Sequence, residues 1–377
     1  MKLLFLNGSR GEWGYIRPII DLCKKQGVDY GICATNMLLL PNHGMLVDEI
    51  RNDGYNISDE IFMSLEGHNH FTMVKSLGVF LMSFIDTIRR EKPDWVVLAG
   101  DRGEMLMGAI AASYTYTPVA HIQAGERSGN IDGVARHAIG KFVHLHFAAN
   151  QDAEERLYRL GEEAFRVHNV GAPQLDELVK YDIPDIKSLG IKLNFPVDKP
   201  FLLLVQHPVT EEMSEATSQV EVLTKALSKI DIHKVWILPN NDAGSQGVRR
   251  TLLQQRASDI YIYDNLTRVD YLGLLKNCAA IVGNSSSGLL EAPTFKTPAV
   301  NLGRRQSDRV QGINVINAEF DQKAIEDAIQ IAISKDFKNK IVNCKNPYGD
   351  GQSSERILDI LKRTNIDNDL LIKKLTY

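Results

Sequence analysis

Short apolar runs alternate with longer amphipathic stretches along most of the chain. The first half contains such runs at residues 3–6, 30–35, 95–99, 119–122 and 144–148. Strands buried on both faces of a parallel sheet are uninterrupted apolar runs of this length, and crossover helices join them. The pattern therefore predicts an α/β fold with a parallel sheet in this half of the chain.

The second half repeats the alternation. Apolar runs recur at residues 201–205, 234–238, 260–263, 279–282 and 299–302. A proline-bearing segment between the halves has the composition of a linker. The chain has 377 residues, which is more than a single hydrophobic core usually supports. We expect two α/β domains, residues 1–175 and 198–352, with a C-terminal segment at residues 353–377. Their strand ends would face each other across a cleft.

A long amphipathic helix is predicted over residues 71–90. Its apolar side chains recur with the period of a helix. They are Val74, Leu77, Phe80, Leu81, Phe84 and Ile88. We expect this stripe to pack in the core.

Composition and charge indicate the compartment of the protein and the classes of partner that it does not bind. A formal net charge of −4 gives no general attraction for nucleic acid or anionic membranes. No apolar run approaches the roughly 20 residues that span a bilayer, and the N-terminus lacks a signal-peptide pattern. The four cysteines lie far apart, which favours reduced thiols. We expect a cytoplasmic protein that binds neither nucleic acid nor membranes.

Candidate acid–base residues follow two neighbouring apolar runs of the first half. Asp101 and Glu126 each come after the end of a run, and Asp132 lies shortly beyond. Ligands bind beyond the carboxyl ends of parallel strands, and grouped carboxylates can differ in proton affinity, so that one serves as base and another as acid. We expect these three to act with His207 of the second domain. The alternative is that Asp101 caps a helix and Glu126 is an exposed loop charge.

The turn at residues 283–288, GNSSSG, is the sharpest phosphate signal. Its small residues let a phosphate approach the backbone, and helix N-terminal amides and hydroxyls can donate to it. Glu291 can accept from ribose hydroxyls, and Arg305 can pair with phosphate oxygens. Arg10, in a glycine-rich loop at residues 7–14, would hold the diphosphate from the other domain. The alternatives are a serine-rich helix cap and an ordinary tight turn.

Patterns for metal and serine-hydrolase chemistry are absent from the sequence. It contains no HExxH motif and no GxSxG turn, and His68 and His70 have no third ligand at a suitable spacing. We expect no metal and no other cofactor.

Taken together, the motifs resemble those of the hydrolysing UDP-N-acetylglucosamine 2-epimerases, in collinear order over nearly the whole chain. They are Gly100-Asp101-Arg102, the HIxxGE-like residues 121–126, Asp132 with Arg136-His137, His207-Pro208, residues 240–245, GNSSSG with Glu291, Leu302-Gly303 with Arg305-Gln306, and residues 348–351. The resemblance implies the GT-B fold, in which two Rossmann-like domains face each other across a cleft. It also implies that the terminal helix crosses back onto the first domain.

The resemblance further implies the reaction and the residue roles. A base removes the C2 proton of a UDP-2-acetamido sugar while UDP leaves C1, which gives a glycal. Water then adds at C1 and a proton returns to the other face of C2, which yields the free manno-configured sugar. Asp101, Asp132 and His207 match catalytic residues. Positions that match the nucleotide site are Arg10, Arg102, Asn240, Ser285, Ser286, Glu291 and Arg305, and Ser287 and Gly288 complete the serine turn. We expect a homodimer or homotetramer.

The chain departs from the family pattern at two positions near the sugar. Gln123 stands where some members carry a catalytic glutamate, and Leu38 stands where a sugar-contacting histidine is expected. A glutamine cannot carry a proton, but it can orient water or an acetamido group. We therefore expect, beside UDP-GlcNAc, an altered substrate such as a UDP-diacetamido-trideoxy hexose, whose 6-methyl would suit Leu38. That route leads toward legionaminic-type acids.

Other functions remain compatible with these motifs. A GT-B glycosyltransferase shares the fold and the nucleotide site but needs no carboxylates around C2. A non-hydrolysing epimerase would return intact UDP-sugar. A nucleotide-sugar sensor would bind without turnover.

Overall fold

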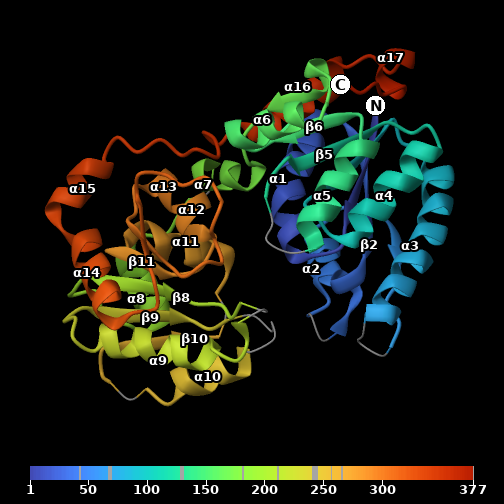
Figure 1. Cartoon of the computed structure of the whole chain (residues 1–377). Coiled ribbons are helices and arrows are strands. Elements are labelled where there is room, and N and C mark those ends of the chain that lie inside the picture. Colours follow the sequence, from blue (N-terminus) through green and yellow to red (C-terminus); the bar gives the residue numbers. More distant parts are fainter. Residues whose placement is uncertain are drawn as a thin grey trace. The chain divides into compact units, whose positions relative to one another are not determined.

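The computed structural model describes residues 1–377 apart from 42–43, 67–69, 128–130, 181, 210–211, 240–244, 256, 265 and 377, and apart from the side chains of His70, Ile131, Asp132 and Lys180. The chain divides into two compact units. Unit 1 comprises Met1–Val179 and Tyr348–Tyr377, and unit 2 comprises Lys180–Pro347. Each contains one parallel sheet with helices on both faces (Figure 1). The predicted α/β class with two Rossmann-like domains is confirmed.

Unit 1 is built on a seven-stranded parallel sheet. Its strands are β1 (Lys2–Asn7), β2 (Asp29–Thr35), β3 (Ile57–Ile61), β4 (Trp95–Ala99), β5 (Val119–Ala124), β6 (Leu145–Ala148) and β7 (Val167–Asn169). They pair in the order β3-β2-β1-β4-β5-β6-β7. The strand order reverses between β1 and β4, and the carboxyl edge at such a reversal is where sheets of this kind bind ligands.

Helices cover both faces of this sheet. They are α1 (Arg10–Gln26), α2 (Leu46–Asn52), α3 (His70–Glu91), α4 (Gly103–Tyr114), α5 (Ile131–Phe142), α6 (Gln151–Arg159), α7 (Asp176–Lys180), α16 (Ser353–Arg363) and α17 (Asn368–Leu371). Along β1, Leu3 and Phe5 join the core with α1 and α16, whereas Leu4 and Leu6 join the core with α3 and α4. Burial on both faces explains why this strand is apolar from Leu3 to Leu6.

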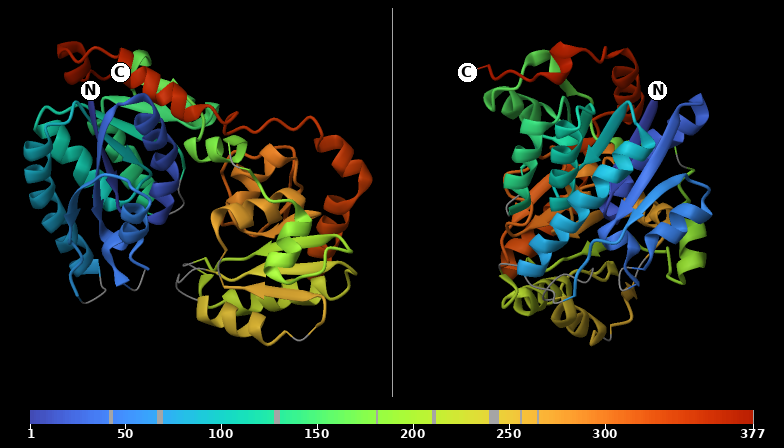
Figure 2. Two further views of the ribbon diagram at one scale, coloured as in Figure 1. Left: turned by 180° about the vertical axis from the view of Figure 1, so that it is seen from behind. Right: turned by 90° about the vertical axis from the view of Figure 1, so that its right-hand side faces the viewer.

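The C-terminal helix α16 is part of unit 1, beside α1 (Figure 2). Its start is fixed by Asp176, whose carboxylate accepts from the backbone N–H groups of Ser353 and Ser354 at 3.0 and 2.6 Å. A carboxylate at this end satisfies amides that have no partner within the helix. The chain therefore returns to its first unit after completing the second.

The long helix α3 carries more apolar surface than the sheet covers. Phe80, Phe84 and Ile88 are buried in the core, as predicted. Val74 is not, because it lies on the outer face with 64% of its surface exposed. Among the described residues, α3 has the length and hydropathy of a membrane span over Phe71–Glu91, although only 28% of that window is buried. Its inner face belongs to the core of unit 1.

Unit 2 contains a six-stranded parallel sheet in the order β10-β9-β8-β11-β12-β13. Its strands are β8 (Phe201–Val205), β9 (His233–Ile237), β10 (Ile260–Tyr263), β11 (Ala280–Gly283), β12 (Ala299–Leu302) and β13 (Val315–Ala318). Its helices are α8 (Ile186–Leu193), α9 (Ala216–Leu227), α10 (Ser245–Leu253), α11 (Arg268–Asn277), α12 (Ser287–Leu290), α13 (Ala292–Phe295), α14 (Gln322–Ile333) and α15 (Lys335–Ile341). Here the order reverses between β8 and β11, so their carboxyl edge is the second candidate for a ligand site.

Candidate functional site

Asp101 is presented at the carboxyl edge of the unit 1 sheet. β4 ends at Ala99, and Gly100 has a φ of 83°, in the left-handed region that favours glycine. His121 on β5 donates from Nε2 to the Gly100 carbonyl over 2.6 Å. Burial lowers the pKa of His121 to about 3, so this imidazole is neutral and acts as a structural donor. The N-cap of α4 is Arg102, so Asp101 is not the helix cap that was the alternative.

Arg136 joins Asp101 to Gln123. From α5, its Nη2 forms an ion pair with Asp101 Oδ2, and its Nη1 donates to the Gln123 carbonyl over 2.6 Å. The Arg136 side chain is 6% exposed and that of Asp101 21%, so the carboxylate remains open on one side. Arg136 was in the motif with Asp132 but was not among the expected site residues. Only the folded structure shows that it positions the acid.

Gln123 occupies a strained backbone position. Its φ is 63°, and the pairing of β5 with β6 is irregular between Ile122 and Ala124. A non-glycine residue in the left-handed region costs about 1–3 kcal/mol and is often found at functional sites. The buried side chain donates from Nε2 to Gln174 Oε1 over 3.4 Å. Gln174 comes from the 3-10 turn Pro173–Leu175, which sequence patterns did not connect with the site.

Glu126 follows the end of β5 by two residues. Its carboxylate is buried and accepts a hydrogen bond from Asn150 Nδ2. Asn150 in turn caps α6 by accepting from the Ala153 N–H at 2.9 Å. Glu126 is thus not the exposed loop charge of the alternative interpretation, and its acid–base role remains a prediction. Its hydrogen bond ties the loop after β5 to α6.

Asp132 and Asn240 cannot be placed as functional side chains. The backbone of Asp132 lies in the first turn of α5, four residues before Arg136, and its side chain is outside the described part. Asn240 falls within 240–244, which is outside the described residues. Both remain predictions.

The predicted glycine-rich loop at residues 7–14 is wrong, because α1 begins at Arg10. Ser9 caps the helix by accepting from the Glu12 N–H at 3.3 Å, and Glu12 accepts from the Gly8 N–H at 2.6 Å. The Glu12 carboxylate therefore accepts from the Gly8 N–H, which is one of the backbone amides that the sequence suggested would bind an anion. Burial and the nearby Glu104 charge raise the pKa of Glu12.

The two arginines of this edge have acidic neighbours. Arg10, on the first turn of α1, pairs with Glu49 at 3.5 Å and is exposed. Arg102 donates to Glu104 at 3.2 Å. Both arginines therefore lie near the carboxyl edge of the sheet, and each is paired with a carboxylate.

Leu38 does not line the sugar end. Its side chain is 1% exposed and packs in the core beneath α1. The expected contact with a 6-methyl group is therefore wrong for this position. Burial of a leucine there is explained by packing alone.

In unit 2, Asn284 organises the carboxyl edge. Its Oδ1 accepts from the His207 N–H at 2.8 Å and its Nδ2 donates to the His207 carbonyl at 2.7 Å. The Asn284 carbonyl accepts from Arg305 Nη1 at 3.1 Å and from Gln306 Nε2 at 3.0 Å. The fully buried Asn284 side chain thereby connects the loops after β8 and β11, and its backbone carbonyl connects them to the loop after β12. It brings His207, Arg305 and the serine turn to one edge.

The serine turn is shaped by close strand packing. Gly283 has a φ of 130°, and a Cβ there would lie 2.2 Å from the Val205 carbonyl oxygen. Ser285 Oγ accepts from the Ser287 N–H at 3.3 Å. Gly288 is buried, and a Cβ there would lie 3.2 Å from Ala299, so it serves packing against β12. The helix predicted after the turn is the short α12, which spans Ser287–Leu290.

Glu291 lies beside this turn, between α12 and α13. Its Oε1 pairs with Arg268 on α11, and its buried Oε2 has no hydrogen-bond partner in the described part of the chain. An orphaned carboxylate oxygen costs free energy unless a ligand donates to it. Burial and the Glu291 charge raise the pKa of Tyr271, whose hydroxyl also bonds with Ser287 and Ser285. Sequence patterns gave no sign of Tyr271.

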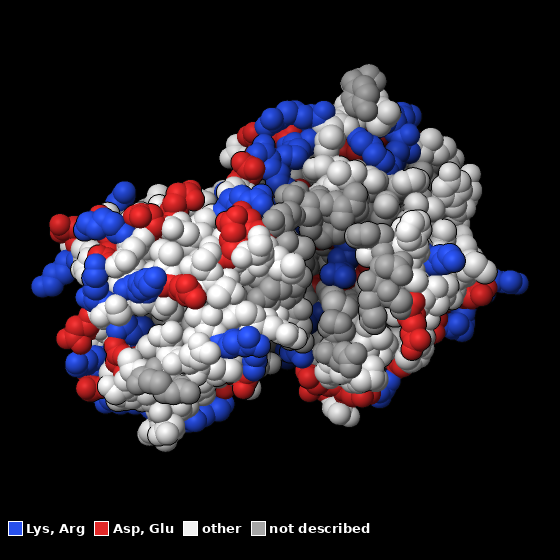
Figure 3. Space-filling model, turned by 60° about the horizontal axis from the view of Figure 1, so that its bottom comes forward, with Lys and Arg blue, Asp and Glu red and all other residues white. Residues whose placement is uncertain are grey.

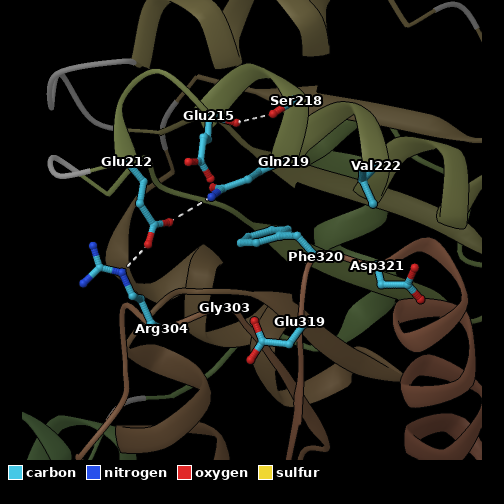
Figure 4. A pocket seen from close by; sticks show the side chains of 10 residues that line it. All are labelled: Glu212, Glu215, Ser218, Gln219, Val222, Gly303, Arg304, Glu319, Phe320 and Asp321. Carbon is cyan, nitrogen blue, oxygen red and sulfur yellow. Dashed lines mark hydrogen bonds and ion pairs between the residues drawn. The ribbon is translucent and has the colours of Figure 1, made fainter.

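A pocket of about 420 Å³ opens nearby, between α9 and the ends of β12 and β13. Figure 4 shows Phe320 among the side chains that line it, with Glu212, Glu215, Glu319 and Asp321 around it. Its cation, Arg304, pairs with Glu212. Because Glu215, Glu319 and Asp321 add negative charge, this pocket does not suit a diphosphate.

Replacing Arg305 by alanine should weaken UDP binding about 10- to 100-fold, since a charge-assisted hydrogen bond contributes about 1.5–3 kcal/mol. Isothermal titration with UDP measures the change. Arg304→Ala is the matched control, because this neighbouring arginine pairs with Glu212 in the acidic pocket and should leave affinity within about threefold. Equal losses in both variants would contradict the assignment of Arg305.

Comparison with known proteins places these features in one family. Residues 21–362 match the sequence profile described as UDP-N-acetylglucosamine 2-epimerase. The chain is 35% identical, over 100% of its length and 99% of the relative, to the UDP-N,N'-diacetylbacillosamine 2-epimerase (hydrolyzing) of Legionella pneumophila. It is 31% identical to the GDP/UDP-N,N'-diacetylbacillosamine 2-epimerase (hydrolyzing) of Campylobacter jejuni, over 98% of this chain and 97% of that protein.

Solved structures agree on the fold. The UDP-GlcNAc 2-epimerase from Neisseria meningitidis bound to UDP-GlcNAc matches with a TM-score of 0.84 at 20% identity, over 97% of this chain and 100% of that one. Sequence and fold therefore lead to one conclusion: the chain belongs to the UDP-N-acetylglucosamine 2-epimerase family, in its hydrolysing branch.

Proposed function

We propose that the protein converts a UDP-2-acetamido sugar and water into the free manno-configured sugar and UDP. The observation that carries this proposal is the Arg136 guanidinium, which holds the Asp101 carboxylate against the strained Gln123 backbone at a ligand-binding edge. A carboxylate held there suits proton transfer at carbon. The named relatives act as hydrolysing 2-epimerases.

The proposed roles divide between the units. In unit 1, Asp101 and Asp132 transfer the C2 proton, and Gln123 orients the sugar or the attacking water. In unit 2, His207 acts near the sugar, Ser285, Ser286 and Arg305 hold the diphosphate, and Glu291 accepts from the ribose. As the C2 proton leaves and the C1–O bond breaks, the electron pair of the C–H bond forms the C1–C2 double bond. Water then supplies oxygen to C1 and a proton to C2, so atoms balance.

Phosphorus and proton NMR of the enzyme with UDP-sugars and no acceptor test this activity. We expect stoichiometric UDP and free sugar. Intact UDP-sugar of inverted configuration would instead show a non-hydrolysing epimerase. A requirement for an added acceptor would show a glycosyltransferase, and binding without turnover a sensor.

The sugar is proposed to carry a second acetamido group. Gln123 and Gln174 form a buried amide pair beside Asp101, and Gln174 Nε2 has no hydrogen-bond partner in the described part of the chain. That N–H can donate to an amide carbonyl, and the side-chain oxygen Oε1 of Gln123 can accept an amide N–H. The names of the Legionella and Campylobacter relatives specify a diacetamido sugar. A route to legionaminic-type acids would consume the product.

Gln174→Leu should therefore lower the ratio of kcat/KM for UDP-diacetylbacillosamine over UDP-GlcNAc by about tenfold or more, because a substrate amide loses its partner. Steady-state kinetics with both substrates gives the ratio. Gln151→Leu, which changes an exposed glutamine on α6, serves as control. An unchanged ratio in an active Gln174→Leu variant would exclude the amide pair, whereas an inactive wild type would exclude the function itself.

We also propose that the protein works in the cytoplasm as a homodimer or homotetramer. All four cysteines are free and buried, which fits a reducing compartment. Basic and acidic side chains are interspersed on the face shown in Figure 3, which favours a small-molecule substrate over nucleic acid.

A further inference from the structure

Two buried carboxyl groups lie at the carboxyl edge of the unit 1 sheet, and the proposed chemistry uses neither of them. Glu12 on α1 and Glu104 on α4 are each 2% exposed. Both lie against Gly8, because the Gly8 N–H donates to Glu12 Oε2 over 2.6 Å and a Cβ on Gly8 would lie 2.3 Å from Glu104 Oε1. Any larger residue at this position would displace one of the two acidic side chains.

The two carboxyl groups differ in their hydrogen bonds. Glu104 Oε1 accepts from Asn36 Nδ2 at 2.8 Å and from Arg102 Nε at 3.2 Å. Glu12 Oε1 is buried and has no hydrogen-bond partner in the described part of the chain. An ionised oxygen in that position is costly, because no donor replaces the water that it has lost. A protonated oxygen is instead a donor, for which the neighbouring Glu104 carboxylate is an acceptor.

The charges around Glu12 also oppose its ionisation. Burial first, and then the charge of Glu104, raise the pKa of Glu12. Arg102 and two local hydrogen bonds lower it by less. Arg102 is itself 39% exposed, so its charge is screened by solvent. The neighbouring charged groups of this edge are engaged in two other ion pairs, Arg10 with Glu49 and Arg136 with Asp101.

We propose that Glu12 and Glu104 hold one proton between them and together act as positioning residues for Arg102. With that proton the pair carries one negative charge, which Arg102 balances from the loop that also presents Asp101. Without it, a second negative charge would repel Glu104 from its place against Gly8 and would oppose an anionic ligand at this edge. The inference rests on the proposed function, in which a UDP-sugar binds here.

Infrared difference spectroscopy detects this proton without any substrate. Ordinary carboxyl groups are ionised at neutral pH, so a carboxylic-acid C=O band in the wild type would come from a perturbed group. We expect such a band at neutral pH, its loss as the pH is raised, and its absence from Glu12→Gln. Glu155→Gln, which removes a half-exposed carboxylate on α6, is the control and should retain the band. A wild type without the band, or a band that survives in Glu12→Gln, would overturn the shared proton.

The dissociation constant of UDP between about pH 6 and pH 9 tests the effect on Arg102. Relative to Glu12→Gln, the wild type should lose about tenfold in affinity as the pH rises, because glutamine stays neutral and still accepts from the Gly8 N–H. The ratio of the two constants cancels the ionisation of UDP itself.

A Glu12 that served only to cap the Gly8 N–H would change the affinity equally at every pH. A constant ratio of dissociation constants would therefore overturn the positioning role. A wild type that shows the band and the pH-dependent ratio but releases no UDP from UDP-sugars would contradict the proposed function alone.

Discussion

Asp101→Asn should lower kcat about 10²- to 10⁴-fold while UDP binding changes little, since general acid–base catalysis contributes about that factor. The amide keeps the size of the side chain and can still accept from Arg136, but it cannot carry the C2 proton. Stopped assays of UDP release give kcat, and titration with UDP gives the affinity. The loss should appear in kcat rather than KM, because the group acts in the transition state.

A control substitution tests whether the loss of any carboxylate in this unit lowers the activity. Asp53→Asn removes an exposed carboxylate next to α2 in the same unit and should retain full activity. If Asp101→Asn turned over at a near-normal rate, the proton transfer would have to be assigned to another residue. Asp132, whose side chain lies outside the described part, would then be the leading candidate.

Glu162→Gln should destabilise unit 1 by about 3–5 kcal/mol, because loss of the carboxylate leaves the largely buried Lys373 ammonium uncompensated. The Glu162 carboxylate is 1% exposed and pairs with Lys141 at 2.9 Å and with Lys373, from the C-terminal segment, at 2.6 Å. His146 also bonds to it at 3.0 Å. The same substitution at Glu155, which is half-exposed on α6, should change the free energy of unfolding by less than about 1 kcal/mol.

The pH dependence follows from the same cluster. Burial alone would raise the pKa of Glu162, but the hydrogen bond from His146 and the charge of Lys373 outweigh it and hold that pKa below its ordinary value of 4.5. The stabilisation is therefore complete above about pH 4.5 and is lost as the pH falls below it. Melting temperatures at pH 6 and pH 4 should differ more for the wild type than for Glu162→Gln. Equal differences would contradict the cluster's role.

The buried strands and the apolar edge strand β10 could be predicted from the sequence, whereas the edge strands β3, β7 and β13 could not. β4 and β8, and β1 between Leu3 and Leu6, are covered on both faces, so their sequences are continuous apolar runs. β3, with sequence ISDEI, and β13, with sequence VINA, are edge strands whose side chains are partly exposed. Their pairing depends on a neighbouring strand rather than on an apolar pattern.

The start of α1 could not be predicted from the local sequence. Gly11 and Gly14 weaken the helix signal by about 1 kcal/mol each, and the sequence therefore suggested a loop. The folded chain compensates with the Ser9 cap and the buried Glu12 carboxylate. Such compensation depends on side chains that meet only after the turn has formed.

The candidate site was predictable where it depends on strand ends. Asp101, His207 and Arg305 follow apolar runs, so their place at a sheet edge followed from the pattern. The contacts that position them come from elsewhere in the chain. These contacts are made by a helix residue, Arg136, a 3-10 turn residue, Gln174, and a buried loop residue, Asn284. Their hydrogen-bond partners are determined by tertiary packing.

The most direct test of the central claim is the hydrogen isotope at C2 of the product. In heavy water, removal of the C2 proton and its return from solvent predict a manno-configured free sugar that carries deuterium at C2, with UDP released in equal amount. Proton NMR of the purified sugar resolves the missing C2 signal. A free sugar that retains the original C2 proton, or that keeps the gluco configuration, would contradict the account.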